Sequence, residues 1–303
     1  MRAAVLAFAS ALVLVGAGGA QAASPEVWKH WSDGKAELSG YRLTQPRYGQ
    51  LRQGTAILIY VTEPFSRSAR VKADPGRHPE QDVETVLKLN VVKDFQTGLY
   101  DYNLMSSLFV AMDAKGGRPA EALKFAFSSH EWCGHVYEEL KVEPTVVERL
   151  YRSYFDGESS DQPVPRLPGG LLTEELLVRV RGLPEPFLAP GQSKALPLLL
   201  SVERSRFLHQ PLRFVPGKVE RSAEAKKLTV PAGTFEVDVY TATAGEERYV
   251  YSVERAFPQR IVAWEGPEGE RAELLGSQRL PYWTLNQEGH ERFLKDLGLP
   301  IPR

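Results

Sequence analysis

The sequence predicts a mainly β protein, an antiparallel curved sheet forming an open half-barrel or a sandwich, with a few short helices that include a C-terminal one. Three observations support this class. Apolar and polar residues alternate over many short segments, which is the period of a strand with one solvated face. Turn residues separate these segments at regular intervals. Helical segments do not alternate with them, which argues against a parallel α/β sheet.

The first half of the chain contains seven predicted strands. Residues 55–62 are apolar and rich in β-branched side chains, and we expect this strand to end at Glu63-Pro64, because proline interrupts a ladder. Residues 84–92 alternate, with leucines on one face and Lys88 and Asn90 on the other. The remaining segments of this kind span residues 38–44, 100–112, 122–129, 136–142 and 146–155.

The second half continues the pattern with five predicted strands, joined by glycine-containing turns such as Ala244-Gly245-Glu246. Many short strands with tight turns are typical of antiparallel all-β proteins. These strands span residues 194–202, 235–242, 248–254, 260–264 and 272–280.

Helices are predicted in three places. Residues 25–31 are expected to open the mature chain, and a short amphipathic stretch begins at 173–176 and ends before Gly182. The third helix spans 286–297, where Thr284 and Gln287 form a capping box and Gly298 ends the helix.

Residues 1–22 predict a secretory signal, with a positive charge at Arg2, an apolar run over 5–15 and a small-residue cleavage site at 20–22. We therefore expect an exported protein, periplasmic or extracellular, that is soluble after cleavage. Residues 23–303 are expected to form a single large β-rich domain. Proline- and glycine-rich stretches leave open a division into two β units near residues 156–190.

Composition excludes several classes of function. The net charge is −1, from 37 Lys and Arg against 38 Asp and Glu, so the chain lacks the basic excess of a nucleic-acid-binding protein. After the signal, no stretch approaches the ~20 apolar residues of a membrane-spanning helix. With Cys133 as its one cysteine, the chain must fold without an internal disulfide.

Three stretches carry a resemblance: residues 60–66, residues 86–90 together with 97–102, and residues 131–135. They resemble an uncharacterised family of exported bacterial proteins, some of which are labelled "septum formation inhibitor Maf". Residues 230–237 also resemble a turn of a broader group of periplasmic β-rich proteins of unknown function. Both resemblances imply antiparallel strands and no established activity.

The Maf label itself conflicts with the sequence. Maf proteins are smaller cytoplasmic nucleotide pyrophosphatases of α/β fold, with a Ser-x-Arg-Arg signature on the first loop. The nearest match here, residues 66–70, is neither early in the chain nor correctly spaced. We therefore treat the label as misleading.

The cluster His130-Glu131-Trp132-Cys133-Gly134-His135 holds residue types that bind zinc. On a strand, Glu131, Cys133 and His135 would share one face, which makes them the candidate metal ligands. Cys133 with His135 as its base is the related thiol-enzyme hypothesis. The alternative is a structural strand with Trp132 and Cys133 buried in the core.

Lys88 and Asn90 are the other binding candidates, because a shared face could let them line a concave groove. The sequence contains no other complete catalytic motif, and we expect no cofactor, with zinc at Glu131, Cys133 and His135 as the alternative. The function that we expect is a non-enzymatic envelope protein that binds an apolar, lipid or glycan ligand on a curved sheet. The alternative is a metal-dependent or thiol enzyme centred on Glu131, Cys133 and His135, and a purely structural assembly partner is a third hypothesis.

Overall fold

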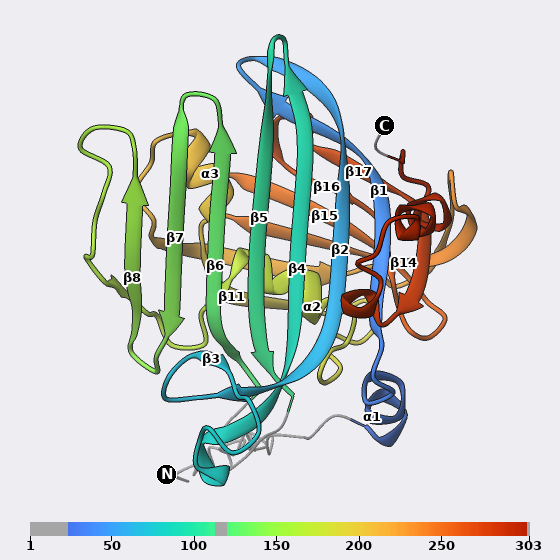
Figure 1. Ribbon diagram of the computed structural model, residues 1–303, viewed down its shortest axis with the longest axis horizontal. Helices are drawn as coiled ribbons and strands as arrows, with labels where there is room; N and C mark the ends of the chain where they lie inside the picture. The colour runs from blue at the N-terminus through green and yellow to red at the C-terminus, as the bar shows by residue number, and fades with distance from the viewer. Residues whose placement is uncertain (1–23, 113–119, 302–303) are drawn as a thin grey trace, which may run out of the picture.

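The protein is described by a computed structural model that covers residues 24–112 and 120–301 (Figure 1). The predicted signal peptide, residues 1–22, lies outside the described residues. The mainly β prediction is confirmed, because one large mixed sheet that is not closed into a barrel dominates the fold. Within the covered ranges, no helix has the length and apolar content needed to cross a membrane.

One continuous hydrogen-bonded sheet contains every strand of the described residues. They are β1 (Ala36–Arg47), β2 (Gln50–Ser66), β3 (Val71–Lys72), β4 (Val83–Thr97), β5 (Tyr100–Ala111), β6 (Ala122–Glu131), β7 (Gly134–Val142), β8 (Val146–Ser153), β9 (Val164–Pro165), β10 (Leu171–Leu172), β11 (Ser193–Leu199), β12 (Phe214–Arg221), β13 (Lys226–Val230), β14 (Gly233–Ala244), β15 (Glu247–Glu254), β16 (Ile261–Glu265) and β17 (Arg271–Leu280). The helices are α1 (Pro25–Trp31), η1 (Glu80–Asp82), η3 (Thr173–Glu175), α2 (Leu176–Arg179), α3 (Val202–Phe207), η4 (Pro267–Gly269), η5 (Tyr282–Thr284) and η6 (His290–Leu297).

The strands pair in the order β9-β8-β7-β6-β5-β4-β2-β1-β17-β16-β15-β14-β12-β11-β10, with β3 beside the end of β2 and β13 beside β14. Every pair is antiparallel except β10 with β11. Antiparallel neighbours need only short turns, which explains why the chain traces the sheet almost in sequence order. The first and last strands of this meander, β1 and β17, pair with each other and join its two halves.

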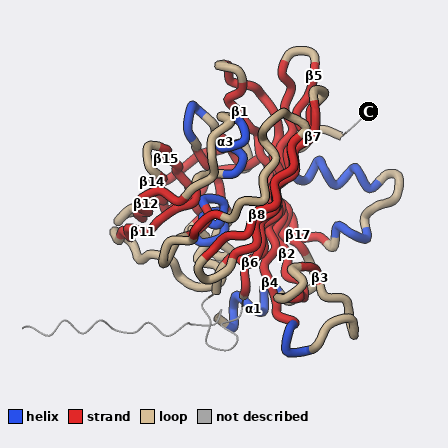
Figure 2. Tube along the Cα trace, turned by 90° about the vertical axis from the view of Figure 1, so that its left-hand side faces the viewer, coloured by secondary structure: helices blue, strands red, loops and turns tan. Residues whose placement is uncertain are grey.

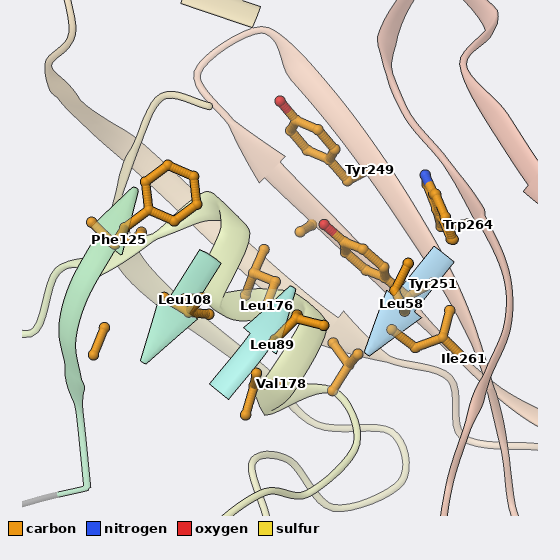
Figure 3. Packing of buried hydrophobic residues seen from close by; sticks show 14 of the residues in the cluster. Leu58, Leu89, Leu108, Phe125, Leu176, Val178, Tyr249, Tyr251, Ile261 and Trp264 are labelled. Atoms are coloured by element: carbon orange, nitrogen blue, oxygen red, sulfur yellow. The ribbon is translucent and has the colours of Figure 1, made fainter. Parts of the chain in front are cut away.

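The sheet folds over into two layers that enclose α2 and α3 (Figures 1 and 2). Strands β1 to β9 form one layer, and β10 to β17 form the other. The core between them combines Leu89 and Leu108 of the first layer, Leu176 of α2, and Tyr251 and Trp264 of the second (Figure 3). Residues from both halves of the chain, including the 156–190 region, therefore share one core.

Most predicted strands are present, but β2 does not end at Glu63-Pro64 as expected. It continues to Ser66, and Pro64 pairs with Thr85 of β4. Because β1 pairs with β2 only as far as Tyr60, the last residues of β2 have no β1 neighbour there, and proline is tolerated at such an edge. The carbonyl of Pro64 still accepts a hydrogen bond, from the N–H of Ala73.

Helices were predicted less accurately. α1 and the η3–α2 segment lie where expected, whereas α3 was missed because its residues continue directly from an apolar strand. The C-terminal helix begins at His290, four residues later than predicted, as a 3-10 helix. The capping box does not form, since the Thr284 hydroxyl donates to the carbonyl of Pro281 instead. Gly298 ends the helix as predicted, with φ +70°.

The C-terminal segment covers the outer face of β1 and β17. Leu297 and Leu299 pack there against Leu38 in a second apolar cluster, on the opposite side of the sheet from the main core. Two glycines allow the close approach: a Cβ at Gly40 would overlap the carbonyl oxygen of Leu297, and one at Gly276 would overlap that of Asp296. Neither glycine has a positive φ, so glycine is needed here because a larger side chain would not fit and not because of the backbone conformation.

We expect Gly40→Ala to lower the free energy of unfolding by about 1–3 kcal/mol, because the added methyl group forces η6 away from the sheet. Urea denaturation measures the loss. Hydrogen exchange should accelerate in residues 290–299 and stay unchanged in β4 and β5, which serve as the internal control. Unchanged stability and exchange would show that η6 does not depend on this contact.

Candidate functional site

A pocket of about 640 Å³ lies where the β1–β2 turn meets the end of α3, toward the upper end of the strands in Figure 1. We call it the rim pocket. Its size falls within the range of small-molecule sites in proteins, roughly 300–1,000 Å³. It is lined by Gln45, Pro46, Arg47, Tyr48, Gly49, Gln50, Leu51, Arg204, Phe207, Leu208, His209 and Glu268.

The β1–β2 turn that forms one wall is a two-residue hairpin turn. Arg47 pairs with Gln50, and the two residues between them, Tyr48 and Gly49, have φ values of +55° and +70°. A turn with two positive φ angles matches the twist of the flanking strands and normally contains Asn-Gly or Asp-Gly. A bulky tyrosine in the left-handed region is unfavourable. The turn therefore holds Tyr48 in place at a cost in backbone energy.

Backbone strain is concentrated around this pocket. Among the described residues, five non-glycine residues have a positive φ, and three of them, Tyr48, His209 and Glu268, line the rim pocket. Each such residue costs of order 1–3 kcal/mol and persists only where surrounding structure imposes it. Strained residues cluster at functional sites, so their distribution marks the rim pocket as a candidate site.

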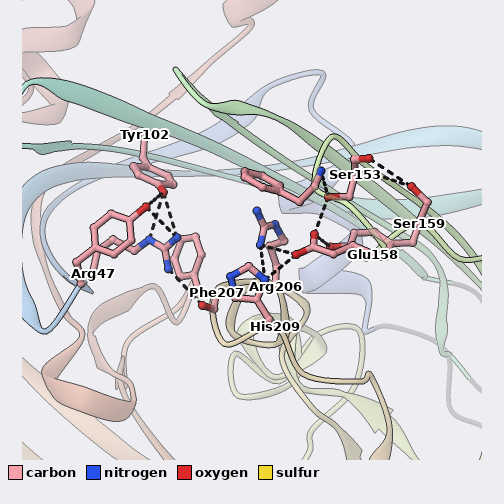
Figure 4. Close-up of polar contacts among 11 residues, drawn as sticks. Arg47, Tyr102, Ser153, Glu158, Ser159, Arg206, Phe207 and His209 are labelled. Carbon is pink, nitrogen blue, oxygen red and sulfur yellow. Dashed lines mark hydrogen bonds and ion pairs between the residues drawn. The ribbon is translucent and has the colours of Figure 1, made fainter.

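Arg47 is held rigidly at the centre of this wall (Figure 4). Its guanidinium carbon lies 4.2 Å from the ring centroid of Tyr48, 4.4 Å from that of Phe207 and 5.2 Å from that of Tyr102. Three aromatic rings from β1–β2, β5 and α3 therefore fix the orientation of one cation through cation–π contacts.

The hydrogen bonds of Arg47 all go to neutral acceptors. It donates to the hydroxyls of Tyr48 and Tyr102 and to the carbonyl of Phe207, over distances of 3.1–3.3 Å. Among the described residues it forms no ion pair with a carboxylate. Arg204 in the same pocket is different, because it contacts Glu247 at 2.8 Å and Glu268 at 3.2 Å. Within the described ranges, Arg47 is thus a prealigned cation without a counter-ion.

The far side of the pocket is fixed by Glu158 (Figure 4). Its carboxylate contacts Nδ1 of His209 at 2.6 Å and accepts hydrogen bonds from the hydroxyls of Ser153 and Tyr151. Burial acts to raise the pKa of Glu158, but these bonds and Arg206 together hold it below its usual value. An ionised Glu158 therefore ties the loop after β8 to the end of α3.

A second space, the inner cavity, lies between the layers and has a volume of about 80 Å³. Arg204 lines both this cavity and the rim pocket. The apolar wall combines residues of both layers with α2, several of which appear in Figure 3. The cavity is lined by Leu89, Val91, Lys93, Ser106, Leu108, Phe125, Thr173, Glu174, Leu177, Ser201, Glu203, Arg204, Tyr249, Tyr251, Trp264 and Glu270.

Lys93 of β4 connects two carboxylates at this cavity. Its Nζ lies 2.9 Å from Glu203 of α3 and 2.8 Å from Glu270, which also accepts from the indole N–H of Trp264. Burial acts to lower the pKa of Lys93, but the two carboxylates raise it above its usual value. Burial raises the pKa of Glu203, whereas Lys93 outweighs burial at Glu270 and lowers its pKa. The lysine therefore stays charged and joins the two layers.

Glu174 is the polar group of this cavity whose bonding is incomplete. Its Oε1 accepts from the N–H of Val202 at 2.8 Å, while its buried Oε2 has no hydrogen-bond partner among the described residues. Burial raises the pKa of Glu174 to about 7, although bonds from Val202 and Ser201 oppose the shift. A buried carboxylate oxygen without a partner is costly, so its presence needs a cause.

The segment of Glu131, Cys133 and His135 is a hairpin and not the continuous strand assumed in the sequence prediction. β6 ends at Glu131 and β7 begins at Gly134, so the residues do not share a strand face. Instead, His130 and His135 pair across the hairpin, with ring centroids 4.7 Å apart. The alternative of a buried strand is also wrong, because Trp132 is 69% exposed and Cys133 is exposed.

Cys133 lies in a setting that disfavours the thiolate. Oε2 of Glu131 accepts a hydrogen bond from the N–H of Cys133 at 2.6 Å, and the same carboxylate raises the pKa of the thiol. In the covered part of the chain, no three His, Cys, Asp or Glu side chains are gathered in a way that could hold a metal ion. The zinc hypothesis for Glu131, Cys133 and His135 stays a prediction.

Lys88 and Asn90 do not line the concave side of the sheet as expected. Leu89, between them, faces the inner cavity, so both residues project from the outer face of β4. Lys88 pairs with Glu63 at 2.9 Å, and Asn90 accepts from Ser107 at 2.8 Å. Both are satisfied by neighbours in the sheet.

The sequence prediction missed the residues that line the rim pocket and the inner cavity. Arg47 and Phe207 are 160 residues apart in the chain, so no local pattern could show their contact. One local pattern does point to the rim pocket, namely Tyr48-Gly49 between two strands. A two-residue turn of this kind places an aromatic residue in the left-handed region.

Comparison with known proteins does not identify this architecture: no protein-family model, curated protein or solved structure matches the chain.

We expect Glu174→Gln to change how stability depends on pH. The pKa of Glu174 rises from 4.5 to about 7 on folding, so the stability that its proton provides is complete below pH 4.5 and is lost as the pH rises to 7. Between pH 5 and pH 8 the free energy of unfolding of the wild type should therefore fall by up to about 3 kcal/mol, and that of the variant should not show this fall. Glutamine can still accept from Val202.

Urea denaturation at the two pH values measures this difference. Glu265→Gln, which neutralises an exposed carboxyl of the second layer, is the matched control and should keep the wild-type pH dependence. Parallel pH profiles for the wild type and Glu174→Gln would contradict the assignment.

Proposed function

We propose that this chain is an exported, non-enzymatic binding protein that holds an anionic amphipathic ligand in the rim pocket. The ligand class is an apolar chain ending in a carboxylate or phosphate. The observation that carries the proposal is the prealigned guanidinium of Arg47, which has no carboxylate partner among the described residues.

A guanidinium suits such a head group. Its planar array of donors matches two oxygens of a carboxylate or phosphate. Charge-assisted bonds have lengths of about 2.7–2.9 Å, shorter than the 3.1–3.3 Å bonds that Arg47 now makes to neutral oxygens. Because three rings already restrict the side chain, little further conformational entropy is lost when an anion binds.

The remaining wall suits an apolar chain. Tyr48 is 55%, Leu51 57% and Leu208 38% exposed, and all three line the pocket beside Phe207. Adjacent apolar side chains left in contact with water mark binding surfaces more often than isolated ones do. A ligand with an anionic head at Arg47 and an apolar body along Leu51 and Leu208 would use both features.

Export and the absence of enzyme activity remain part of this proposal. The charged and apolar segments at residues 1–22 support export. The alternative, a thiol or metal enzyme at Glu131, Cys133 and His135, has weaker support, because Glu131 raises the pKa of the exposed Cys133 thiol. Nucleophilic cysteines need a lowered pKa.

Decanoate tests the proposal. Isothermal titration calorimetry at pH 7.5, below the micellar concentration, should show one decanoate bound per mature chain and much weaker binding of decanol, which lacks the charge. Arg47→Gln should weaken decanoate binding about 10- to 100-fold, because a hydrogen bond to a charged group contributes about 1.5–3 kcal/mol. Arg47→Lys should recover part of the affinity, since it restores charge but not the planar donors.

Arg42→Gln is the matched control. It removes the same charge from the same strand, but Arg42 is exposed, pairs with Glu273 and does not line the pocket. Its affinity for decanoate should equal that of the wild type. Equal affinities of wild type and a folded Arg47→Gln variant, or of decanoate and decanol, would refute the proposal.

A further inference from the structure

The inner cavity has an excess of negative charge that its own residues do not balance. Lys93 carries one positive charge against the carboxylates of Glu203 and Glu270. Arg204 is already shared between Glu247 and Glu268. Ionised Glu174 would add a further negative charge beside them. The cavity therefore favours a positive occupant, either a proton or a cation.

The unpartnered Oε2 of Glu174 shows where such an occupant would bind. This oxygen is buried and accepts no hydrogen bond within the described ranges, while the other oxygen is fixed by Val202. The Ser201 hydroxyl bonds to the carboxyl but leaves Oε2 without a partner among the described residues. The charged and titratable groups that face the carboxyl from the surrounding elements donate no hydrogen bond to Oε2 either. These groups are Glu203 and Arg204 on α3, Lys93 on β4, Tyr249 and Tyr251 on β15, and Glu270 after η4.

The walls indicate an organic cation and not a metal ion. Tyr249, Tyr251 and Trp264 present aromatic rings, which attract ammonium groups, and Leu89 and Leu108 add apolar surface. In the covered part of the chain, no three His, Cys, Asp or Glu side chains are gathered in a way that could hold a metal ion. At about 80 Å³, the cavity is roughly half the size of an engineered cavity that holds benzene, so it suits a cation of only a few non-hydrogen atoms.

We propose that the inner cavity is a binding site for a small primary ammonium ion, held by the Glu174 carboxylate and the surrounding aromatic rings. This site is separate from the rim pocket and does not depend on the function proposed there. The ammonium ion takes the place of the proton on Glu174, so each binding event at acidic pH releases one proton. Arg204 lines both spaces.

Ethylammonium chloride is the probe, and the mature protein is titrated by calorimetry at pH 6 and pH 8 in two buffers of different ionisation enthalpy. With the pKa of Glu174 at about 7, some nine-tenths of this carboxyl is protonated at pH 6. Ethylammonium should therefore bind about tenfold more tightly at pH 8. At pH 6 the heats in the two buffers should differ by close to one proton released per ion bound.

Glu174→Gln should abolish ethylammonium binding at both pH values, while circular dichroism and cooperative unfolding confirm that the variant is folded. Arg42→Gln, a charge change outside the cavity, should bind as the wild type does. Neutral propanol and the larger tetraethylammonium ion should not bind. The proposal fails if the wild type does not bind ethylammonium at pH 8, if folded Glu174→Gln binds it equally well, or if binding releases no proton at pH 6.

Discussion

The buried ion pair between Arg181 and Glu37 is the interaction on which the arrangement of the two layers depends. The guanidinium contacts both carboxylate oxygens, at 2.7 and 3.1 Å, and neither side chain is more than 3% exposed. It also donates to the carbonyl of Gln259 in the second layer and lies against the rings of Tyr60 and Trp31. One side chain thus joins α1, β1, β2, the end of α2 and the second layer. Loss of either charge would leave its partner buried and unpaired, at a cost of several kcal/mol.

The charged side chains at the two ends of β1 differ in whether they have a partner of opposite charge. Glu37 stands near the beginning of the strand and is fully compensated, whereas Arg47 closes the strand about 33 Å away and has no carboxylate partner among the described residues. Both arginines are held between aromatic rings, so packing does not distinguish them. The difference lies in the counter-ion. A paired arginine contributes to folding, whereas an arginine held by rings and by neutral oxygens can exchange these weaker hydrogen bonds for charge-assisted ones to another molecule.

The sequence predicted most strands of the sheet but not the residues of the candidate sites. Alternation identified β4 and β5, whereas β12 was missed because Pro216 and Gly217 interrupt its apolar pattern. The concave role of Lys88 was wrong because alternation defines two faces without showing which one the second layer covers. Burial of Lys93 on that same strand could not be foreseen, since its partners Glu203 and Glu270 lie more than 100 residues away. Sites assembled from distant residues leave no local pattern, while strands and turns do.

The two outermost strands of the open sheet, β9 and β10, are each two residues long and are separated in the chain by only residues 166–170. Within the described residues, no ladder joins β9 to β10, although each pairs with its other neighbour. Residues 166–170 therefore connect the two layers covalently at a place where, within the described ranges, β9 and β10 do not pair. Between β9 and β10 the layers are joined by this connection and by the packing of their shared core, while strand pairing joins them at β1 and β17. Outer strands as short as these also offer few free backbone groups with which a strand of another chain could pair, which limits aggregation at these edges of the sheet.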